Sequence, residues 1–291
     1  MYGRQLVSIA AISLAALSLT GCPDEGGGAT PAPSGKPTTR AGSTGTGTAA
    51  SPGTGAAKPS GEATTPAPSG ATGSVKGVVT FAGKAPEMKV PAKRKDAELC
   101  KDKQVPYNAV IAKDGKLKDV LVKIVGVKGK FEVPKKHAEI DQVDCMYSPR
   151  VQGVMAGQDI DIKNGDATLH NVHTNKGAET LFNQAQPKGS PAITKSFDDE
   201  AIIKFTCDVH PWMRGYVVVH DTPFFAVSGD DGSFAIDKVP TGKYEVVAWH
   251  SQFGTKKGSV EVAEGKAGEV KFEFSDKDEN PDNKDELKGL W

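Results

Sequence analysis

The protein has 291 residues, and its 36 Lys and Arg residues balance 36 Asp and Glu residues, so the formal net charge at pH 7 is zero. Nucleic-acid binding requires a clustered basic excess that neutralises phosphates, so this balance argues against nucleic acid as a partner. Glycine (33 residues) and proline (19 residues) exceed their average usage and are concentrated early, so the average composition describes no single segment of the chain.

The N-terminus carries the features of a secretory signal. Arg4 precedes an apolar run from Leu6 to Leu19, which is too short to span a bilayer comfortably. The sequence Leu-Thr-Gly-Cys that ends at Cys22 resembles the lipobox of bacterial lipoproteins, in which the cysteine becomes the lipid-modified N-terminus. The resemblance implies a signal peptide and lipobox over residues 1–22. It also implies a lipid-anchored protein of the bacterial cell envelope, in the periplasm or at the cell surface. An ordinary signal with an incidental cysteine is the alternative.

Two segments lack the apolar residues that a folded core requires. Residues 23–74 consist almost entirely of Gly, Ala, Ser, Thr and Pro, so we expect a disordered linker that tethers the folded part. Residues 275–291 are charged, and we expect a flexible tail there.

The rest of the chain predicts an all-β fold. Short runs that alternate apolar and polar residues are separated by turn residues, and no stretch has a sustained helical period. About ten such runs in some two hundred residues favour two small sandwiches. The run SGDDGSFAIDKVPTGKYEVVAWH, residues 228–250, is similar to the carboxypeptidase regulatory-like modules. That resemblance implies a transthyretin-like sandwich of residues 75–129 and 221–274, with residues 130–220 nested in it; tandem domains are the alternative layout.

Two stretches hold side chains that bind metals. Cys207, His210 and Met213 lie in one loop after a strand whose alternation turns Cys207 inward, and His170 follows another half-buried strand. Two imidazoles and a thiolate, with a weak axial thioether, are the donors of a type 1 copper site. His173 has the opposite strand parity to His170, so we expect it to face outward.

The sequence CDVHPWMRGYVVV together with HNVH resembles the cupredoxins, and most closely the amicyanins. The resemblance implies a Greek-key sandwich within residues 130–220 and a copper ion bound by His170, Cys207, His210 and Met213. A zinc site made of His170, His173, Cys207 and His210, or a sandwich without metal, is the alternative. We expect the side chain of Asn171 to bridge the two ligand-bearing loops and support the ligands. Pro211 and Trp212 are candidates for a partner surface, although Trp212 alternatively packs against the sandwich.

Cysteine accounting predicts a disulfide. With Cys22 assigned to lipid and Cys207 to metal, Cys100 and Cys145 remain as one pair in an oxidising compartment; two free thiols are the alternative.

No hydrolase or nucleotide-binding motif of the types G-x-S-x-G, H-E-x-x-H or G-K-[ST] occurs in the sequence, so catalysis is not indicated. We expect a membrane-anchored blue copper protein that transfers single electrons between redox partner proteins. The other hypotheses are an envelope module that binds carbohydrate or protein and has a structural metal, and a protein that stores or delivers copper.

Overall fold

The computed structural model describes residues 70–91, 100 and 106–283. The described chain is built from β-strands, with the short 3-10 helix η2 (Pro281–Asn283) near its end, so the predicted all-β fold is confirmed. The strands form four sheets, two of five strands and two of four. The predicted signal peptide, the lipobox cysteine Cys22 and most of the predicted linker lie outside the described residues.

One pair of sheets uses strands from the beginning and the end of the described chain. In the first sheet, β1 lies between antiparallel β15 and parallel β18 and also contacts the small hairpin β2–β3. The second sheet has the order β14-β4-β16-β17. The bounds are β1 (Thr72–Ala82), β2 (Ala112–Lys113), β3 (Lys116–Leu117), β4 (Leu121–Val125), β14 (Phe225–Val227), β15 (Ser233–Pro240), β16 (Gly242–His250), β17 (Gly254–Val262) and β18 (Ala267–Ser275).

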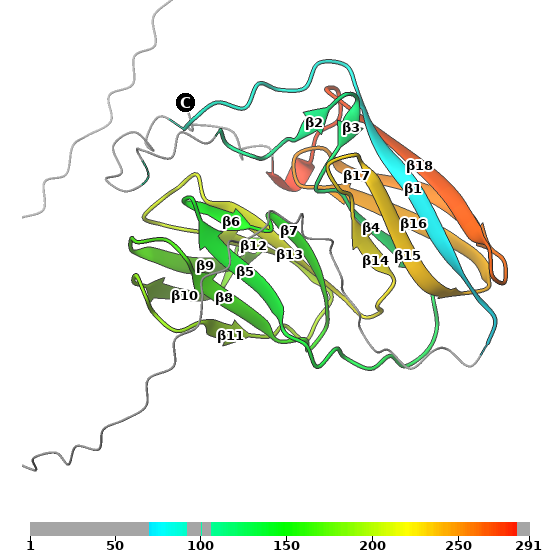
Figure 1. Ribbon diagram of the computed structural model, residues 1–291, viewed down its shortest axis with the longest axis horizontal. Coiled ribbons are helices and arrows are strands. Elements are labelled where there is room, and N and C mark those ends of the chain that lie inside the picture. Colours follow the sequence, from blue (N-terminus) through cyan, green and yellow to red (C-terminus); the bar gives the residue numbers. More distant parts are fainter. Residues whose placement is uncertain (1–69, 92–99, 101–105, 284–291) are drawn as a thin grey trace, which may run out of the picture. The chain divides into compact units, whose positions relative to one another are not determined.

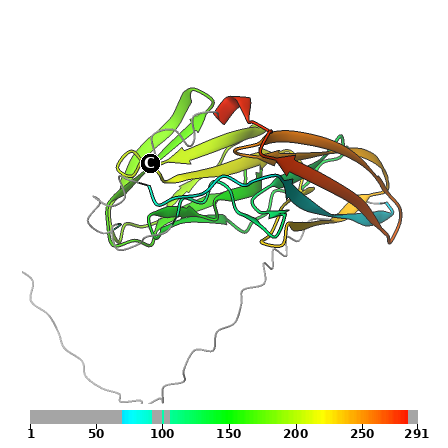
Figure 2. The ribbon, with the colours of Figure 1, turned by 90° about the horizontal axis from the view of Figure 1, so that it is seen from above.

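The other pair of sheets uses the strands between β4 and β14. Its sheets have the orders β10-β9-β12-β13-β7 and β11-β8-β5-β6. Figures 1 and 2 both show β5–β13, in green to yellow, as a group distinct from β1–β4 and β14–β18. The bounds are β5 (Ala138–Val143), β6 (Met146–Ser148), β7 (Val151–Met155), β8 (Ile160–Asn164), β9 (His170–Lys176), β10 (Glu179–Gln186), β11 (Ile193–Lys195), β12 (Ala201–Thr206) and β13 (Arg214–His220).

Alternation along the strands explains which side chains form the core. In β12, Ile203 and Phe205 are buried, whereas Ile202, on the opposite face of the strand, is exposed. In β8, Ile160 and Ile162 are fully buried and belong to the same hydrophobic cluster as the two β12 residues. Because successive side chains of a strand point to opposite faces, each strand contributes every second residue to this cluster.

The ends of the predicted segments differ from the structure. β1 begins at Thr72, so the last residues of the predicted linker are part of a sheet. The prediction of a flexible tail from residue 275 is wrong for residues 275–283, because Asn280 and Asn283 are buried and both donate hydrogen bonds to the main-chain oxygen of Ser251. The charged composition of this segment does not reveal that it is ordered, because the side chains that anchor it, Asn280 and Asn283, are polar. In the part of the chain that the structure describes, no helix has the length and apolar character needed to cross a membrane.

Candidate metal centre

The loop that joins β12 to β13 carries three of the four predicted ligands. Cys207 follows the last residue of β12 and keeps the inward parity of Ile203 and Phe205, so it is 1% exposed. The main-chain N–H of Met213 donates to the carbonyl oxygen of His210 at 2.8 Å, which closes the loop into a turn before β13 begins. This turn returns Met213, fully buried, to the end of the sheet from which Cys207 departs.

The fourth predicted ligand comes from the neighbouring strand. His170 is the first residue of β9, which pairs with β12, so the start of β9 lies beside the end of β12. His170 is fully buried, and His210 is 5% exposed. Sheet pairing thus brings together two stretches that are 37 residues apart in the chain.

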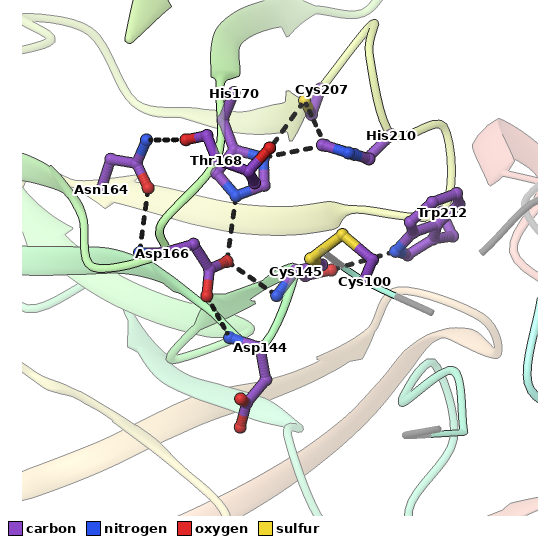
Figure 3. Close-up of a disulfide and its surroundings, with 10 residues drawn as sticks. All are labelled: Cys100, Asp144, Cys145, Asn164, Asp166, Thr168, His170, Cys207, His210 and Trp212. Carbon is purple, nitrogen blue, oxygen red and sulfur yellow. Dashed lines mark hydrogen bonds and ion pairs between the residues drawn. A yellow bond between two sulfur atoms is a disulfide. The ribbon is translucent and has the colours of Figure 1, made fainter. Parts of the chain in front are cut away.

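Three donor atoms converge in this region, and Figure 3 shows their side chains pointing toward one another. The Nδ1 atoms of His170 and His210 are 2.9 Å apart. The Sγ atom of Cys207 lies 3.9 Å from Nδ1 of His170 and 3.7 Å from Nδ1 of His210. A point equidistant from three atoms at these separations lies about 2 Å from each, which is the length of a metal–imidazole bond. The three donors therefore fit one metal ion.

The electrostatics of the site favour the thiolate form of the cysteine. Burial by itself raises the pKa of the Cys207 thiol, but the contacts with His170, His210 and the main-chain N–H of Asn171 outweigh it and lower this pKa to about 6. Burial likewise disfavours a charged His170, yet its bonds to Asp166 and Cys207 raise the pKa of this imidazole. A thiolate is the form in which cysteine binds a metal.

Asn171 joins the two ligand-bearing segments. Its side-chain oxygen accepts a hydrogen bond from the main-chain N–H of Asp208 at 2.6 Å and lies 3.3 Å from Sγ of Cys207. Its side-chain nitrogen donates to the carboxylate of Asp208 and to the side-chain oxygen of Asn183. Asn171, which follows the candidate ligand His170, thus fixes Asp208, which follows the candidate ligand Cys207.

His173 does not join the donors. Its Nδ1 lies 2.9 Å from the carboxylate of Asp208, and its Nε2 lies 3.0 Å from the hydroxyl of Thr180. The two clusters of metal-binding side chains in the described residues are His170 with Cys207 and His210, and Cys145 with Asp166 and His170. A zinc site that includes His173 is therefore not assembled in this structure.

The residues beside His210 have different environments. Pro211 is exposed, whereas Trp212 is 2% exposed and its ring lies 5.2 Å from the ring of His210. Trp212 therefore packs inside the protein, and its prediction as a partner surface is wrong. Its indole N–H explains this placement, because it donates to the main-chain oxygen of Cys145 at 3.0 Å.

The predicted disulfide between Cys100 and Cys145 is present. It lies close to the metal centre, and the sequence provides no sign of this closeness.

Two further residues that contact the centre were not predicted. The carboxylate of Asp166 lies 2.9 Å from Nε2 of His170. The hydroxyl of Tyr147 donates to the main-chain oxygens of Thr206 and Asn171, and so ties the two ligand-bearing strands together. The sequence offers one signal for Asp166, namely its position four residues before His170. This spacing has no meaning until the conformation of the loop is known.

Comparisons with known proteins give partial matches. The family model for domain II of polysaccharide lyase family 4 matches residues 205–270. A search of curated proteins finds no match. A purple cupredoxin from Nitrosopumilus maritimus is similar at 25% identity over 28% of this chain and 99% of that chain, with a TM-score of 0.26. Amicyanin from Paracoccus versutus is similar at 23% identity over 34% of this chain and 97% of that chain, with a TM-score of 0.26.

A copper-containing nitrite reductase from Thermus scotoductus is similar at 19% identity over 34% of this chain and 26% of that chain, with a TM-score of 0.28. The matched family model describes a polysaccharide lyase domain, so the carboxypeptidase regulatory-like resemblance stays a prediction. Because these similarities are partial and their TM-scores are low, the geometry of the donors carries the functional inference.

Proposed function

We propose that this protein is a type 1 copper protein that transfers single electrons outside the cytoplasm. The observation that supports the proposal is the buried convergence of His170, Cys207 and His210, with both Nδ1 atoms and Sγ within 3.9 Å of one another. Met213, buried at the end of the same loop, would supply the weak axial thioether.

Sheet pairing and hydrogen bonds hold the donor side chains in place independently of a metal. Sheet pairing sets His170 opposite the loop of Cys207, and the Asn171 side chain holds that loop through the N–H of Asp208. Copper bound there would exchange one electron between its two oxidation states. Because the protein holds the donors in place, they need little rearrangement between the two states.

The composition of the donor set favours copper over structural zinc. Structural zinc sites have four nitrogen or sulfur ligands in a tetrahedron. Around Cys207, the described His, Cys, Asp and Glu side chains supply one sulfur and two nitrogens. A buried methionine thioether is a poor fourth ligand for zinc but a common axial ligand for type 1 copper.

The test is to load the full chain with Cu(II) and to record visible absorption and electron paramagnetic resonance. We expect an intense thiolate-to-copper absorption band that disappears on one-electron reduction and returns on oxidation. A colourless Cu(II) complex would contradict the proposal. Rapid transfer of copper to an acceptor, without reversible redox cycling, would instead support storage or delivery.

We also propose that this protein exchanges electrons with redox partner proteins and does not convert a substrate. We further propose that a lipid on Cys22 anchors the protein to a membrane of the bacterial envelope. The lipobox resemblance supports the anchor, and the absence of hydrolase motifs supports a carrier that is not an enzyme. Mass spectrometry of the N-terminal peptide tests the anchor. We expect an acylated Cys22 in the native chain, and release of the Cys22→Ser variant from the membrane fraction.

A further inference from the structure

A strained hairpin turn lies against the metal centre. β5 and β6 are joined by Asp144 and Cys145, and the pair Val143–Met146 closes the hairpin. Asp144 and Cys145 both have φ of 55°, the left-handed region that a two-residue type I′ turn requires. Turns of this type favour Asn and Gly, and a cysteine in this region costs roughly 1–2 kcal/mol. Such a conformation persists when its surroundings determine it.

The main-chain N–H groups of this turn hold Asp166. The N–H of Asp144 donates to Oδ1 of Asp166 at 2.9 Å, and the N–H of Cys145 donates to Oδ2 at 2.8 Å. The same Oδ2 lies 2.9 Å from Nε2 of His170, as Figure 3 shows. Because an ionised carboxylate can only accept, His170 carries a proton on Nε2 and donates it to Asp166.

The same turn also contacts Trp212, whose ring lies beside His210. The main-chain oxygen of Cys145 accepts the hydrogen bond from Nε1 of Trp212, whose ring lies 5.2 Å from the ring of His210. Cys145 therefore contacts one partner of each histidine, on one side through its N–H and on the other through its carbonyl.

The disulfide restrains the residue that makes both contacts. Cys145 and Cys100 are 2% and 0% exposed, and the bond between them joins positions 45 residues apart. Sγ of Cys145 lies within 4.8 Å of a carboxylate oxygen of Asp166 and a ring nitrogen of His170. The covalent link thus ends beside the metal centre.

We propose that the Cys100–Cys145 disulfide and Asp166 together form a positioning element of the metal centre: the disulfide holds the Asp144–Cys145 turn, the turn holds Asp166, and Asp166 holds the His170 ring with Nδ1 toward the other donors. This inference deepens the proposed copper function and rests on it. Without the disulfide, Cys145 relaxes toward an ordinary backbone conformation and the carboxylate loses its two N–H partners. The orientation of His170 is then less well defined.

The first experiment uses the metal-free, nitrogen-15-labelled full chain, so that its result does not depend on the copper spectrum. The measured quantity is the solvent exchange rate of the Nε2 proton of His170 by nuclear magnetic resonance. We expect this proton to exchange at least about tenfold faster in the double variant C100S/C145S. Copper affinity should fall by about 10–100-fold, the usual cost of losing a partner of a metal ligand.

The Asp166→Ala variant keeps the disulfide and provides the second test should the double variant fail to fold. We expect the same faster exchange and the same weaker copper binding. The matched control is Val260→Ala, which removes buried methyl groups from β17 and none of the turn's hydrogen bonds. It should lower stability and leave the exchange of the His170 proton unchanged once exchange by global unfolding is subtracted.

Native exchange and native copper affinity in Asp166→Ala would overturn the proposal. So would a folded C100S/C145S variant that differs from the native chain in stability alone, as the Val260→Ala control does. If the proposed copper function is wrong, the native chain binds Cu(II) without the thiolate absorption band. The proton-exchange comparison in the metal-free chain still decides the role of the turn in that case.

Discussion

Two pairs of buried histidines lie in this protein, and they have opposite surroundings. His170 and His210 face a thiol and each other, and their ring centroids are 4.7 Å apart. His220 and His250 instead stack on phenylalanine rings, with centroids 4.4 Å and 4.8 Å apart and interplanar angles of 26° and 18°. All four are at most 5% exposed, so burial does not distinguish the two pairs.

The difference lies in the groups around each ring. Burial lowers the pKa of His220 to about 3, with Lys123 adding to the effect, so this side chain is neutral at physiological pH. For His170, burial also opposes the charge, but Asp166 and Cys207 reverse the direction and raise the pKa. His170 and His210 are candidate ligands because the Cys207 thiol lies beside both rings, whereas His220 and His250 belong to no cluster of metal-binding side chains in the described part of the chain.

The largest expected effect follows from removing the thiolate. Cys207→Ser replaces the sulfur by a hydroxyl that does not ionise near neutral pH, so we expect complete loss of the thiolate absorption band. Visible spectroscopy of the copper-loaded full chain measures the loss. The control is Ser259→Ala, in β17 and remote from the donors, which should keep the band.

Replacing one histidine from each pair tests whether the two pairs differ in function. His170→Ala removes a metal donor, and we expect copper affinity to fall by more than about 100-fold, since losing only a ligand's partner costs about 10–100-fold. His220→Phe keeps an aromatic ring against Phe225 and should leave copper affinity unchanged. Competition titrations with a chelator measure both. Equal losses in the two variants would mean that the two pairs do not differ in function.

Alanine substitutions at Asn171 and Asn183 test whether the Asn171 side chain supports the metal ligands. Asn171→Ala deletes the acceptor of the Asp208 N–H, and we expect copper binding to weaken by about 10–100-fold. Asn183→Ala deletes a donor to the carboxylate of Asp208 and an acceptor of the Asn171 side-chain nitrogen, but it keeps the bond between the Asn171 side-chain oxygen and the Asp208 N–H. A change of less than about threefold is expected. Measured dissociation constants that rank the two variants in the reverse order would exclude the bridging role of Asn171.

The smallest expected effect is a pH dependence from the packing pair. The pKa of His220 is lowered from 6.5 to about 3 in the folded state, so the unfolded chain binds a proton between these values that the folded chain does not. Stability from neutral His220 is therefore complete above pH 6.5 and is lost as the pH falls toward 3. Between pH 7 and pH 5 the loss is about 2 kcal/mol.

Urea unfolding of the metal-free chain at pH 7 and pH 5 measures this loss. The His220→Phe variant lacks the titrating group, so its stability should fall less over the same interval by about 2 kcal/mol. Groups common to both chains, including His170 and Cys207, cancel in the comparison. A parallel pH dependence of the two chains would show that His220 does not contribute.

The sequence predicted the donors because their identity and spacing are local properties. One loop contains Cys207, His210 and Met213, and strand alternation gave the inward orientation of Cys207 and the outward orientation of His173. Alternation could not predict Asp166 as a partner of His170, because their contact depends on a turn in a third segment. The error at Trp212 has the same origin, since its hydrogen-bond acceptor is 67 residues away.

Residue type, strand alternation and counting were enough to predict the all-β class, the four candidate ligands and the pairing of Cys100 with Cys145. The tertiary structure decided where the disulfide ends, which carboxylate holds His170 and which histidines merely pack against phenylalanine. Metal chemistry depends on side-chain identity, which the sequence states outright. The surroundings of a ligand depend on sheet register and turn conformation, which are settled only when distant segments pair.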